Sequence, residues 1–398
     1  MKQAASASLL RNLNRSAVLD LFLQNQVISR SQIARKLNMS LPTALRIIAE
    51  LEDRNLVRPA GYSQETALGR PSALLEFNGG AYAVIGLDLG GTKMLGATMD
   101  LSGTTQAEIS LPASPGGAQD NLELVYELIE RLLASPRPVE QQILGIGIGA
   151  PGVTLVNQGI VTWAPSLGWR DLPLKSLIAD RFKLPVYVDN DVNLAALGEL
   201  RYGAGRGVKN LVAIAIGTGI GAGIILNGTL FRGTNQAAGE IGYLPPGIEF
   251  LNRHYDQFGA LEILASGSGI AERGRRNLER TRRFYQGTDF NAEGVFNAAR
   301  QGEAWALDTI SETIDYLALA IAATACLLNP EVITIGGGVA RSADLLIEPI
   351  VQRIQGVIPF VPRIVASPLG QRASLLGSII LVLNEVMDYA VVNSYGTS

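Results

Sequence analysis

The sequence has 398 residues, 47% of them hydrophobic, with 33 basic and 36 acidic side chains and a formal net charge of −3. This length predicts two or three domains, and the composition excludes a disordered chain. The single cysteine excludes an intramolecular disulfide, and the absence of an apolar signal core after Met1 predicts a cytoplasmic protein with no membrane partner.

Charge is distributed unevenly along the chain. Residues 1–75 carry ten Lys and Arg and five Asp and Glu, a net of +5, whereas the remainder has a net of −8. A basic segment in front of an acidic body indicates that the first segment contacts a polyanion. A chance local bias would give the same difference, so charge alone leaves this open.

Three short helices are predicted near the N-terminus. Apolar residues at helical spacing predict the first over Leu13 to Phe22, and Ser29-Arg30-Ser31-Gln32 is a capping box that begins the second. Ser40 caps the third, and the tight turn between the last two predicts a helix-turn-helix. In the third helix the residues expected to face inward are Ile47, Ile48 and Leu51, and those expected outward are Thr43, Ala44 and Arg46.

Two strands follow, over Asn55–Arg58 and Ala73–Phe77, and the loop between them contains Gly69-Arg70-Pro71. Together with the helix pair they form the pattern of a winged helix, and an arginine on an extended loop suits a narrow minor groove. A solvated charge is the simpler interpretation of Arg46 alone, but helix, wing and basic bias together favour duplex DNA. The predicted DNA-binding residues are Ser40, Thr43, Arg46 and Arg70.

Glycine-rich turns follow three predicted strands in the rest of the chain. Tyr82–Leu87 leads into a turn over 88–93, the strand over 211–216 into 217–223, and the strand over 332–335 into 336–339. Glycine lets a ligand approach without an intervening Cβ, and successive N–H groups in such turns bind anions. One such turn by itself is more often a plain hairpin or bulge.

A fourth strand, over 185–188, ends in carboxylates and amides, in the run Asp189-Asn190-Asp191-Val192-Asn193. Further strands are predicted over 94–99 and 143–148, and residues 154–171 are expected to form a loop. Helices are predicted over 121–133, from 194, in part of 272–300, over 310–328 and over 375–386. Cys326 falls in the helix over 310–328, where we expect a small core residue rather than a reactive thiol.

The order and spacing of these four strand ends resemble the two-lobed ATP-binding fold of hexokinase, actin and the Hsp70 chaperones, and most closely its ROK branch of repressors and sugar kinases. The Ser-Arg-x-x-Ile-Ala run at 29–34 and the Gly-Arg-Pro loop are similar to the DNA-binding head of ROK repressors. The resemblance implies an α/β protein, with a winged helix-turn-helix over 1–78 and a two-lobed actin-like (ribonuclease H-like) body. Lobe 1 would comprise 79–190, completed by a C-terminal helix within 375–398, and lobe 2 would comprise 191–374.

The resemblance also implies roles for individual residues. Asp191 would be the catalytic base that takes a proton from a sugar hydroxyl, although a turn aspartate at a strand end is the simpler interpretation of that residue alone. The sugar would be bound by Asn190, Asp191, Glu240, Glu262, Gly152 and Ser166. The nucleotide would be bound by Asp88, Gly90, Gly91, Thr92, Lys93, Gly217, Thr218, Gly219, Gly337 and Gly338.

The chain departs from the ROK pattern at the sugar and metal positions. Ser166 stands where relatives usually have an Asn, and Tyr243 stands where their Gly-Glu-x-Gly-His run has its histidine. The three zinc-binding cysteines of relatives are replaced by Arg253, Tyr255 and Ala260. With one His and one Cys in the sequence, we expect no zinc site and no structural metal or cofactor.

Three functions compete. The first is a regulator, expected to act as a repressor of carbohydrate genes, with duplex DNA and a small-molecule sugar effector as partners and a homodimer or homotetramer as its assembly. The second is an ATP-dependent, glucokinase-like sugar kinase with an appended DNA-binding head. The third is a regulator that senses a nucleotide or a protein through the same cleft. The head favours the first function, and the intact turn over 88–93, with Asp191, leaves Mg-ATP binding and weak kinase activity open.

Overall fold

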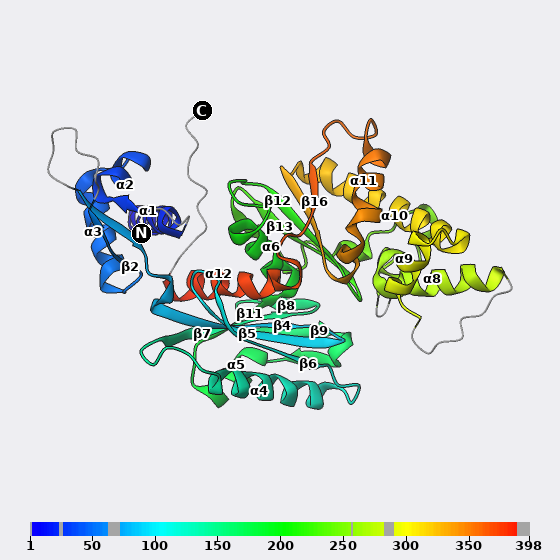
Figure 1. The fold of residues 1–398 in the computed structure, drawn as a ribbon, viewed down its shortest axis with the longest axis horizontal. Helices are drawn as coiled ribbons and strands as arrows, with labels where there is room; N and C mark the ends of the chain where they lie inside the picture. Colours follow the sequence, from blue (N-terminus) through cyan, green and yellow to red (C-terminus); the bar gives the residue numbers. More distant parts are fainter. Residues whose placement is uncertain (1, 24–26, 63–71, 256–257, 282–289, 388–398) are drawn as a thin grey trace.

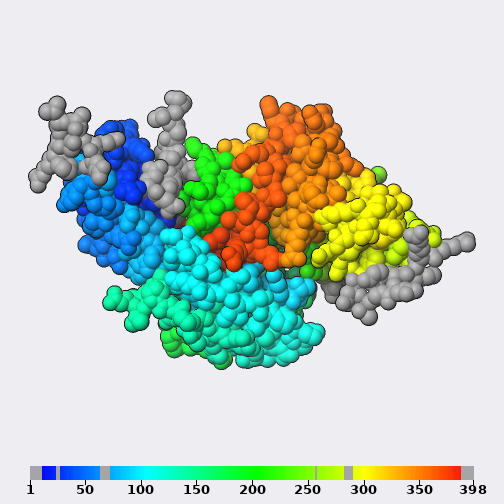
Figure 2. Space-filling view, in the orientation of Figure 1, coloured from blue at the N-terminus to red at the C-terminus, as the bar shows by residue number. Residues whose placement is uncertain are grey.

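A computed structural model describes residues 2–23, 27–62, 72–255, 258–281 and 290–387. These residues form a head and two lobes (Figure 1). The head comes first in the chain, and in the space-filling view it lies against the first lobe (Figure 2). The described elements therefore follow the order head, lobe 1 and lobe 2, and the final helix returns to lobe 1.

The head is a winged helix with a longer first helix than predicted. A three-stranded sheet in the order β1-β3-β2 accompanies three helices. Their bounds are α1 Lys2–Leu23, β1 Ile28–Ser29, α2 Arg30–Lys36, α3 Leu41–Asp53, β2 Val57–Tyr62 and β3 Ala73–Phe77. The predicted loop with Gly69, Arg70 and Pro71 lies outside the described residues.

Both predicted helix caps of the head are present. Ser29 Oγ accepts from the Gln32 backbone N–H at 3.3 Å, and the Gln32 side chain accepts from the Ser29 N–H at 2.9 Å. Ser40 Oγ accepts from the Thr43 N–H at 3.3 Å. These bonds satisfy N–H groups that have no partner within the first helical turn, which is why α2 and α3 begin where they do.

One residue of α3 faces the other way from its prediction. Ala44 was expected outward, but it is fully buried with Ile47, Ile48 and Leu51. These residues are spaced i, i+3, i+4 and i+7, so they share one helix face. A small apolar side chain costs little free energy to expose or to bury. The helical spacing therefore determines which face Ala44 lies on, and the prediction did not apply that spacing to it.

Lobe 1 is a five-stranded sheet in the order β11-β7-β4-β5-β6, with helices on both faces. Helices α4 and α5 cover one face, and α12 packs on β4 and β7 from the other (Figure 1). The bounds are β4 Tyr82–Leu89, β5 Lys93–Asp100, β6 Thr105–Pro112, α4 Ala118–Ala134, β7 Gln142–Ala150, α5 Leu174–Phe182, β11 Val186–Asn190 and α12 Ala373–Met387. The buried, almost continuous apolar runs of β4 and β7 are typical of strands covered on both faces.

The expected loop over residues 154–171 is wrong, because most of it forms a small antiparallel sheet. Its strands are β8 Val153–Leu155, β9 Ile160–Ala164 and β10 Trp169–Leu172, in the order β10-β9-β8. Trp169 is buried, and its ring N–H donates to the Ala118 carbonyl at 3.0 Å. This long-range contact, together with β-branched and aromatic residues in β9, explains why the segment is ordered.

Lobe 2 is built on a second five-stranded sheet, in the order β14-β13-β12-β15-β16. Helix α6 lies between the lobes, packing on α12 and β7 on one side and on β12 and β13 on the other. The bounds are α6 Asp191–Tyr202, β12 Leu211–Ile216, β13 Ile220–Leu226, β14 Thr229–Phe231, α7 Glu262–Ala265, α8 Gly267–Arg280, α9 Ala292–Arg300, α10 Ala304–Leu328, β15 Val332–Gly336, α11 Ala343–Ile354 and β16 Arg363–Ala366.

Helix α10 is the core helix of lobe 2. Among the described helices it alone is long and apolar enough to cross a membrane, but half of that apolar window is buried, and α10 packs on α8, α9 and α11. The prediction that Cys326 is a core residue is wrong, since its side chain is exposed. Cys326 and Leu327 occupy the last turn on the face turned away from the buried Ile321 and Ala325.

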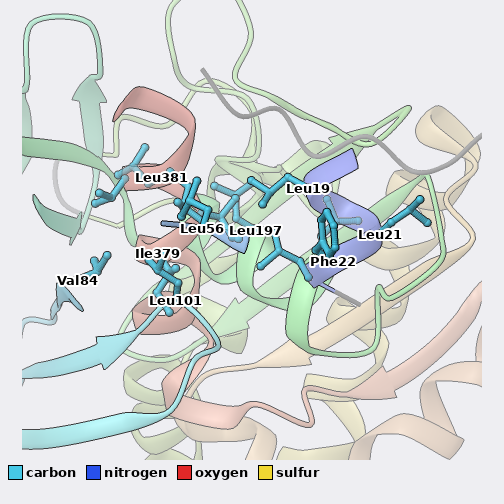
Figure 3. Close-up of a cluster of buried hydrophobic side chains, with 14 of the residues drawn as sticks. Leu19, Leu21, Phe22, Leu56, Val84, Leu101, Leu197, Ile379 and Leu381 are labelled. Carbon is cyan, nitrogen blue, oxygen red and sulfur yellow. The ribbon is translucent and has the colours of Figure 1, made fainter. Parts of the chain in front are cut away.

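The head shares a hydrophobic core with the body. One cluster joins head residues such as Leu19, Phe22 and Leu56 to Leu197 of α6 and Ile379 of α12 (Figure 3). Burial of apolar surface contributes roughly 25 cal/mol per Å². A continuous buried cluster therefore fixes the head on the body, where a bare linker would leave it free to swing.

Candidate functional site

The first turn of α6 is organised by Asn190, the last residue of β11. Asn190 Oδ1 accepts from the backbone N–H groups of Val192 at 2.9 Å and Asn193 at 3.1 Å, so it caps the helix. Its side-chain amide donates to the Gly152 carbonyl at 2.9 Å. Gly152 has a φ of +76°, and a Cβ there would collide with the Trp163 carbonyl, so this close approach requires glycine.

A fully buried carboxylate supports this turn, and sequence reasoning gave it no role. Asp189 accepts from the Asn190 N–H at 2.7 Å and from the Asn193 side chain at 2.9 Å. Its other oxygen accepts from Arg232 Nε at 3.0 Å and Nη2 at 2.6 Å. Arg232 follows β14, so this two-bond ion pair ties lobe 2 to the strand end that carries Asn190 and Asp191.

Two partly buried carboxyl groups interact electrostatically, Asp88 in β4 and Asp191 at the start of α6. Burial raises the pKa of Asp191 well above its ordinary value, and the negative charges of Asp88 and Glu240 raise it further. Burial also raises the pKa of Asp88 to about 6, against the opposing effects of the nearby Ser374 hydroxyl and the Lys93 ammonium. A carboxyl group with a pKa near neutrality is suited to accept a proton from a bound hydroxyl.

Glu262 is fixed by the backbone on both oxygens. It accepts from the Ile220 N–H at 2.8 Å and from the Gly259 N–H at 2.7 Å. A Cβ at Gly219 or Gly242 would collide with this carboxylate. Burial, and secondarily the charge of Glu262, raises the pKa of Glu240. Asp88, Asp191, Glu240 and Glu262 therefore gather in one acceptor-rich region, the kind of lining that matches the donors of a polyol.

Tyr243, at the position of the histidine in relatives, lies beside this region. The residue is 44% exposed, and partial burial, followed by the negative charges of Glu262 and Glu240, raises its pKa. Among the described residues, no group of three or more His, Cys, Asp and Glu side chains is arranged to hold a metal ion. The fixed orientation of Glu262 instead comes from the two backbone N–H groups.

The first glycine turn lies under Ser166. A Cβ at Gly91 would lie 2.5 Å from that of Ser166, so the two approach closely, and the Gly90 N–H donates to the Lys93 carbonyl at 3.0 Å. Lys93 Nζ donates to Gln371 at 2.6 Å, and Thr92 is exposed. Ser166 is therefore placed over the predicted phosphate turn.

The second and third glycine turns meet at the start of α8. The Gly267 N–H donates to the Gly217 carbonyl at 2.8 Å, and Ser268 Oγ donates to the Thr218 carbonyl at 3.1 Å. Gly337 has a φ of +80° and packs against the Ile216 carbonyl so closely that a Cβ would collide with it. The start of α8 therefore packs against the second glycine turn, a contact that sequence reasoning missed. Gly219 stands beside Glu262, and Gly338 is exposed next to Gly337.

The predicted DNA-binding residues of α3 share its exposed side. Ser40 and Thr43 hydroxyls lie 2.8 Å apart, and Arg46 is exposed. Leu41 and Leu45 are 47% and 42% exposed on the same helix, a feature that sequence reasoning missed. Arg70 lies outside the described residues. An exposed helix face that mixes hydroxyl, cationic and apolar groups suits base edges in a major groove.

The ROK family model matches residues 84–385. The chain belongs to the ROK family. A second model, for winged helix-turn-helix DNA-binding domains, matches residues 11–58. Together the two models cover most of the helical part of the head and nearly all of the body of this ROK protein.

Two groups of curated proteins are similar to this ROK chain. A putative xylose repressor of Caldicellulosiruptor sp. is 30% identical over 397 residues, covering 96% of this chain and 98% of that protein. A glucokinase of Halalkalibacterium halodurans is 36% identical over 310 residues, covering 74% and 92%. The similarity to the repressor thus extends over the head, whereas the similarity to the glucokinase covers about three quarters of the chain.

Solved structures divide in the same way. A ROK family transcriptional regulator described as a homolog of the E. coli MLC protein has a TM-score of 0.80 and 26% identity, covering 95% of this chain and 99% of that one. A ROK glucokinase from Streptomyces griseus, in complex with glucose and AMPPNP, has a TM-score of 0.67 and 29% identity, covering 75% and 98%.

Proposed function

We propose that this ROK protein is a DNA-binding transcriptional regulator, a repressor of carbohydrate metabolism, whose body senses a sugar or sugar derivative. One observation carries this conclusion: the winged helix is packed into the same hydrophobic cluster as α6, the helix whose first turn lies in the candidate sugar site. A metabolic enzyme has no need of such a head. Similarity over the whole chain to xylose repressors supports the same function.

The partners follow from the proposed function. The head would bind a roughly palindromic operator as part of a homodimer or homotetramer, because two winged helices related by a two-fold axis contact two half-sites. We expect this assembly in the cytoplasm. The effector would be a small sugar held by Asn190, Asp191, Glu240 and Glu262. Gly152 and Ser166 would be adjacent to it. Each hydroxyl left without a partner in such a site would cost about 1–3 kcal/mol.

Arg46→Ala should weaken operator binding by about 1–3 kcal/mol and relax base preference at one position, because Arg46 projects from the exposed side of α3. The measurement is the operator Kd at fixed salt, using a sequence selected in vitro from genomic DNA. Arg353→Ala, on α11 of lobe 2, is the matched control and should leave this Kd unchanged. Failure to enrich any sequence, or equal binding by the Arg46 variant, would contradict the DNA function of the head.

The sugar function is tested by release of the operator. In a panel of hexoses, pentoses, amino sugars and their phosphates, one class should change operator affinity. Asn190→Ala and Asp191→Ala should each abolish that response while leaving sugar-free operator binding intact. If no member of the panel changes operator affinity, the sugar-sensing part of the proposal is wrong.

A sugar kinase is the second candidate, favoured by specific retained groups. The turns at Asp88–Lys93 and Gly217 retain the glycines and the lysine of the kind that hold Mg-ATP phosphates, and the partly buried Asp191, with its raised pKa, is suited to take a proton. The losses at Ser166 and Tyr243 fall on sugar orientation, and a 1 Å misplacement costs on the order of 100-fold in rate. We therefore infer poor phosphoryl transfer at most.

The kinase alternative has its own measurement. A coupled ADP-release assay across the sugar panel should give turnover far below the roughly 1–100 s⁻¹ usual for kinases. Turnover within that range, abolished in Asp191→Ala, would make phosphoryl transfer the main activity.

The protein should also keep its fold without zinc. Arg253, Tyr255 and Ala260 offer no thiolate, and Glu262 is already oriented by two backbone N–H groups. Elemental analysis of the purified protein should find no stoichiometric zinc, and a chelator should leave its melting temperature unchanged. One tightly held zinc per chain would overturn this expectation.

A further inference from the structure

Helix α6 reaches from the candidate sugar site to the head. Its cap is Asn190 and its first residue is Asp191, both in the site, while Arg201 lies in its last turn. At 1.5 Å per residue, the ten residues from Asp191 to Arg201 span about 15 Å. A single short helix therefore has one end in the candidate sugar site and the other end beside the DNA-binding head.

An ion pair buried at the far end joins α6 to the head. Arg201 Nη1 lies 3.8 Å from Asp20 Oδ1 of α1, and the two side chains are only 9% and 6% exposed. Arg201 Nε is buried and has no hydrogen-bond partner among the described residues. A close charge-assisted hydrogen bond would measure about 2.7–2.9 Å, so this contact is a loose one.

The geometry of this pair makes it sensitive to small movements. Attraction between buried charges rises steeply as they approach, because the surroundings screen them weakly. An advance of Asp20 toward Arg201 would tighten the pair and bring an acceptor toward Nε, whereas a retreat would weaken the attraction on the buried Arg201 guanidinium. A slight displacement of α6 relative to α1 thus changes the electrostatic energy of the Asp20–Arg201 pair by a large amount.

The rest of α6 has no room to absorb such a displacement. A Cβ on Gly198 would collide with the Ala373 carbonyl, and one on Gly377 with the Leu194 carbonyl, so α6 and α12 are in backbone contact. Leu197 and Leu200 of α6 share the buried cluster with Leu19 of α1. Figure 3 shows Leu197 and Leu19 within it. Close-packed interiors transmit small shifts rather than deforming.

We propose that the Asp20–Arg201 pair couples the sugar site to the DNA-binding head through α6, so that ligand at Asn190 and Asp191 changes the position of α1. The inference rests on the proposed function, and it names the contact through which the response is transmitted. Neither residue touches the candidate sugar site or the exposed side of α3.

The test uses full-length protein with Asp20→Asn, Arg201→Met, the double variant and Arg201→Lys. D-xylose and D-glucose are the probe sugars, and operator Kd is measured with and without each. In the parent protein, sugar should change operator Kd by roughly 5–150-fold, the usual range for coupled sites. In the two single variants and the double variant this factor should fall about fivefold or more, while Arg201→Lys, which keeps the charge, should retain part of it.

A matched control lies within the head. Arg30 Nη2 lies 2.7 Å from Glu52 Oε1, and this pair does not involve the body. Arg30→Met should leave the sugar-dependent factor unchanged. Within each variant, operator must change the sugar Kd by the same factor by which sugar changes the operator Kd. A difference between these two factors would indicate misfolded protein.

A second measurement needs no ligand. Hydrogen exchange at the Val192 and Asn193 N–H groups, at the opposite end of α6, should become faster in the double variant but not in Arg30→Met. Unchanged exchange there, or a full sugar response in the double variant, would overturn the inference. A parent protein that binds operator but ignores every sugar would instead refute the proposed function, and the exchange result would still decide the role of the pair.

Discussion

Gly377→Ala should be among the most destabilising single-methyl additions in this protein. A Cβ at this position would lie well inside contact distance of the Leu194 carbonyl carbon and oxygen, which are backbone atoms and cannot rotate away. Overpacking costs about 1–3 kcal/mol and occasionally more, whereas alanine gains up to about 1 kcal/mol over glycine in a helix. The collision should win, and the expected result is a lower urea midpoint of unfolding.

Gly294→Ala provides a matched control of opposite sign. Gly294 is in the first turn of α9, it is exposed, and a Cβ there would meet only Asn291 Oδ1 at an ordinary 3.6 Å. Helix propensity should therefore act alone and raise the midpoint slightly. If Gly377→Ala matched Gly294→Ala, the close crossing of α6 and α12 would be wrong.

Asp88→Asn should stabilise the ligand-free protein at alkaline pH. This gain in stability should disappear at acidic pH. The folded-state pKa of Asp88 is raised from 3.8 to about 6, so the folded protein binds a proton that the unfolded chain has released. This contribution to stability is present below pH 3.8 and is lost as the pH rises through about 6. At about 1.4 kcal/mol per pKa unit, ionising Asp88 costs the fold up to roughly 3 kcal/mol at pH 8.

The measurement is the urea midpoint of the parent and variant at about pH 3 and pH 8. The advantage of Asp88→Asn should be near its full size at the higher pH and nearly absent at the lower one, because below pH 3.8 the carboxyl is protonated in both the folded and the unfolded protein. Asp344→Asn is the control of opposite sign, since hydrogen bonding to Arg300 lowers the pKa of Asp344. A destabilised Asp88→Asn protein at pH 8 would show that the carboxylate is compensated in the fold.

Local chemistry made the strand ends predictable. The glycine turns after β4 and β12, and the Asp-Asn-Asp run after β11, combine a buried apolar strand with residues that few other roles require. The two helix caps at Ser29 and Ser40 were equally local. Features of this kind depend on neighbours within about four residues, which a sequence displays directly.

Long-range partners were beyond such reasoning. Arg232 holds Asp189 from 43 residues away, and nothing in the spacing of either residue marks the pair. Trp169 reaches Ala118 across 51 residues, which orders the sheet that was expected to be a loop. Ala44 and Cys326 were misplaced because small side chains carry little energetic preference for core or surface. The contact between the start of α8 and the turn at Gly217 was missed because it joins residues 50 positions apart.

The return of α12 to lobe 1 also governs how the protein is made. The sheet of lobe 1 is complete in sequence by Asn190, but the helix that covers β4 and β7 ends at Met387. During synthesis the N-terminal head emerges first, while the apolar face of lobe 1 stays bare until nearly the whole chain has been translated. A chain cut short before residue 373 would lack both that cover and the α12 part of the cluster around Leu19. Premature stop codons late in the gene should therefore yield unstable products and not permanently DNA-bound repressors.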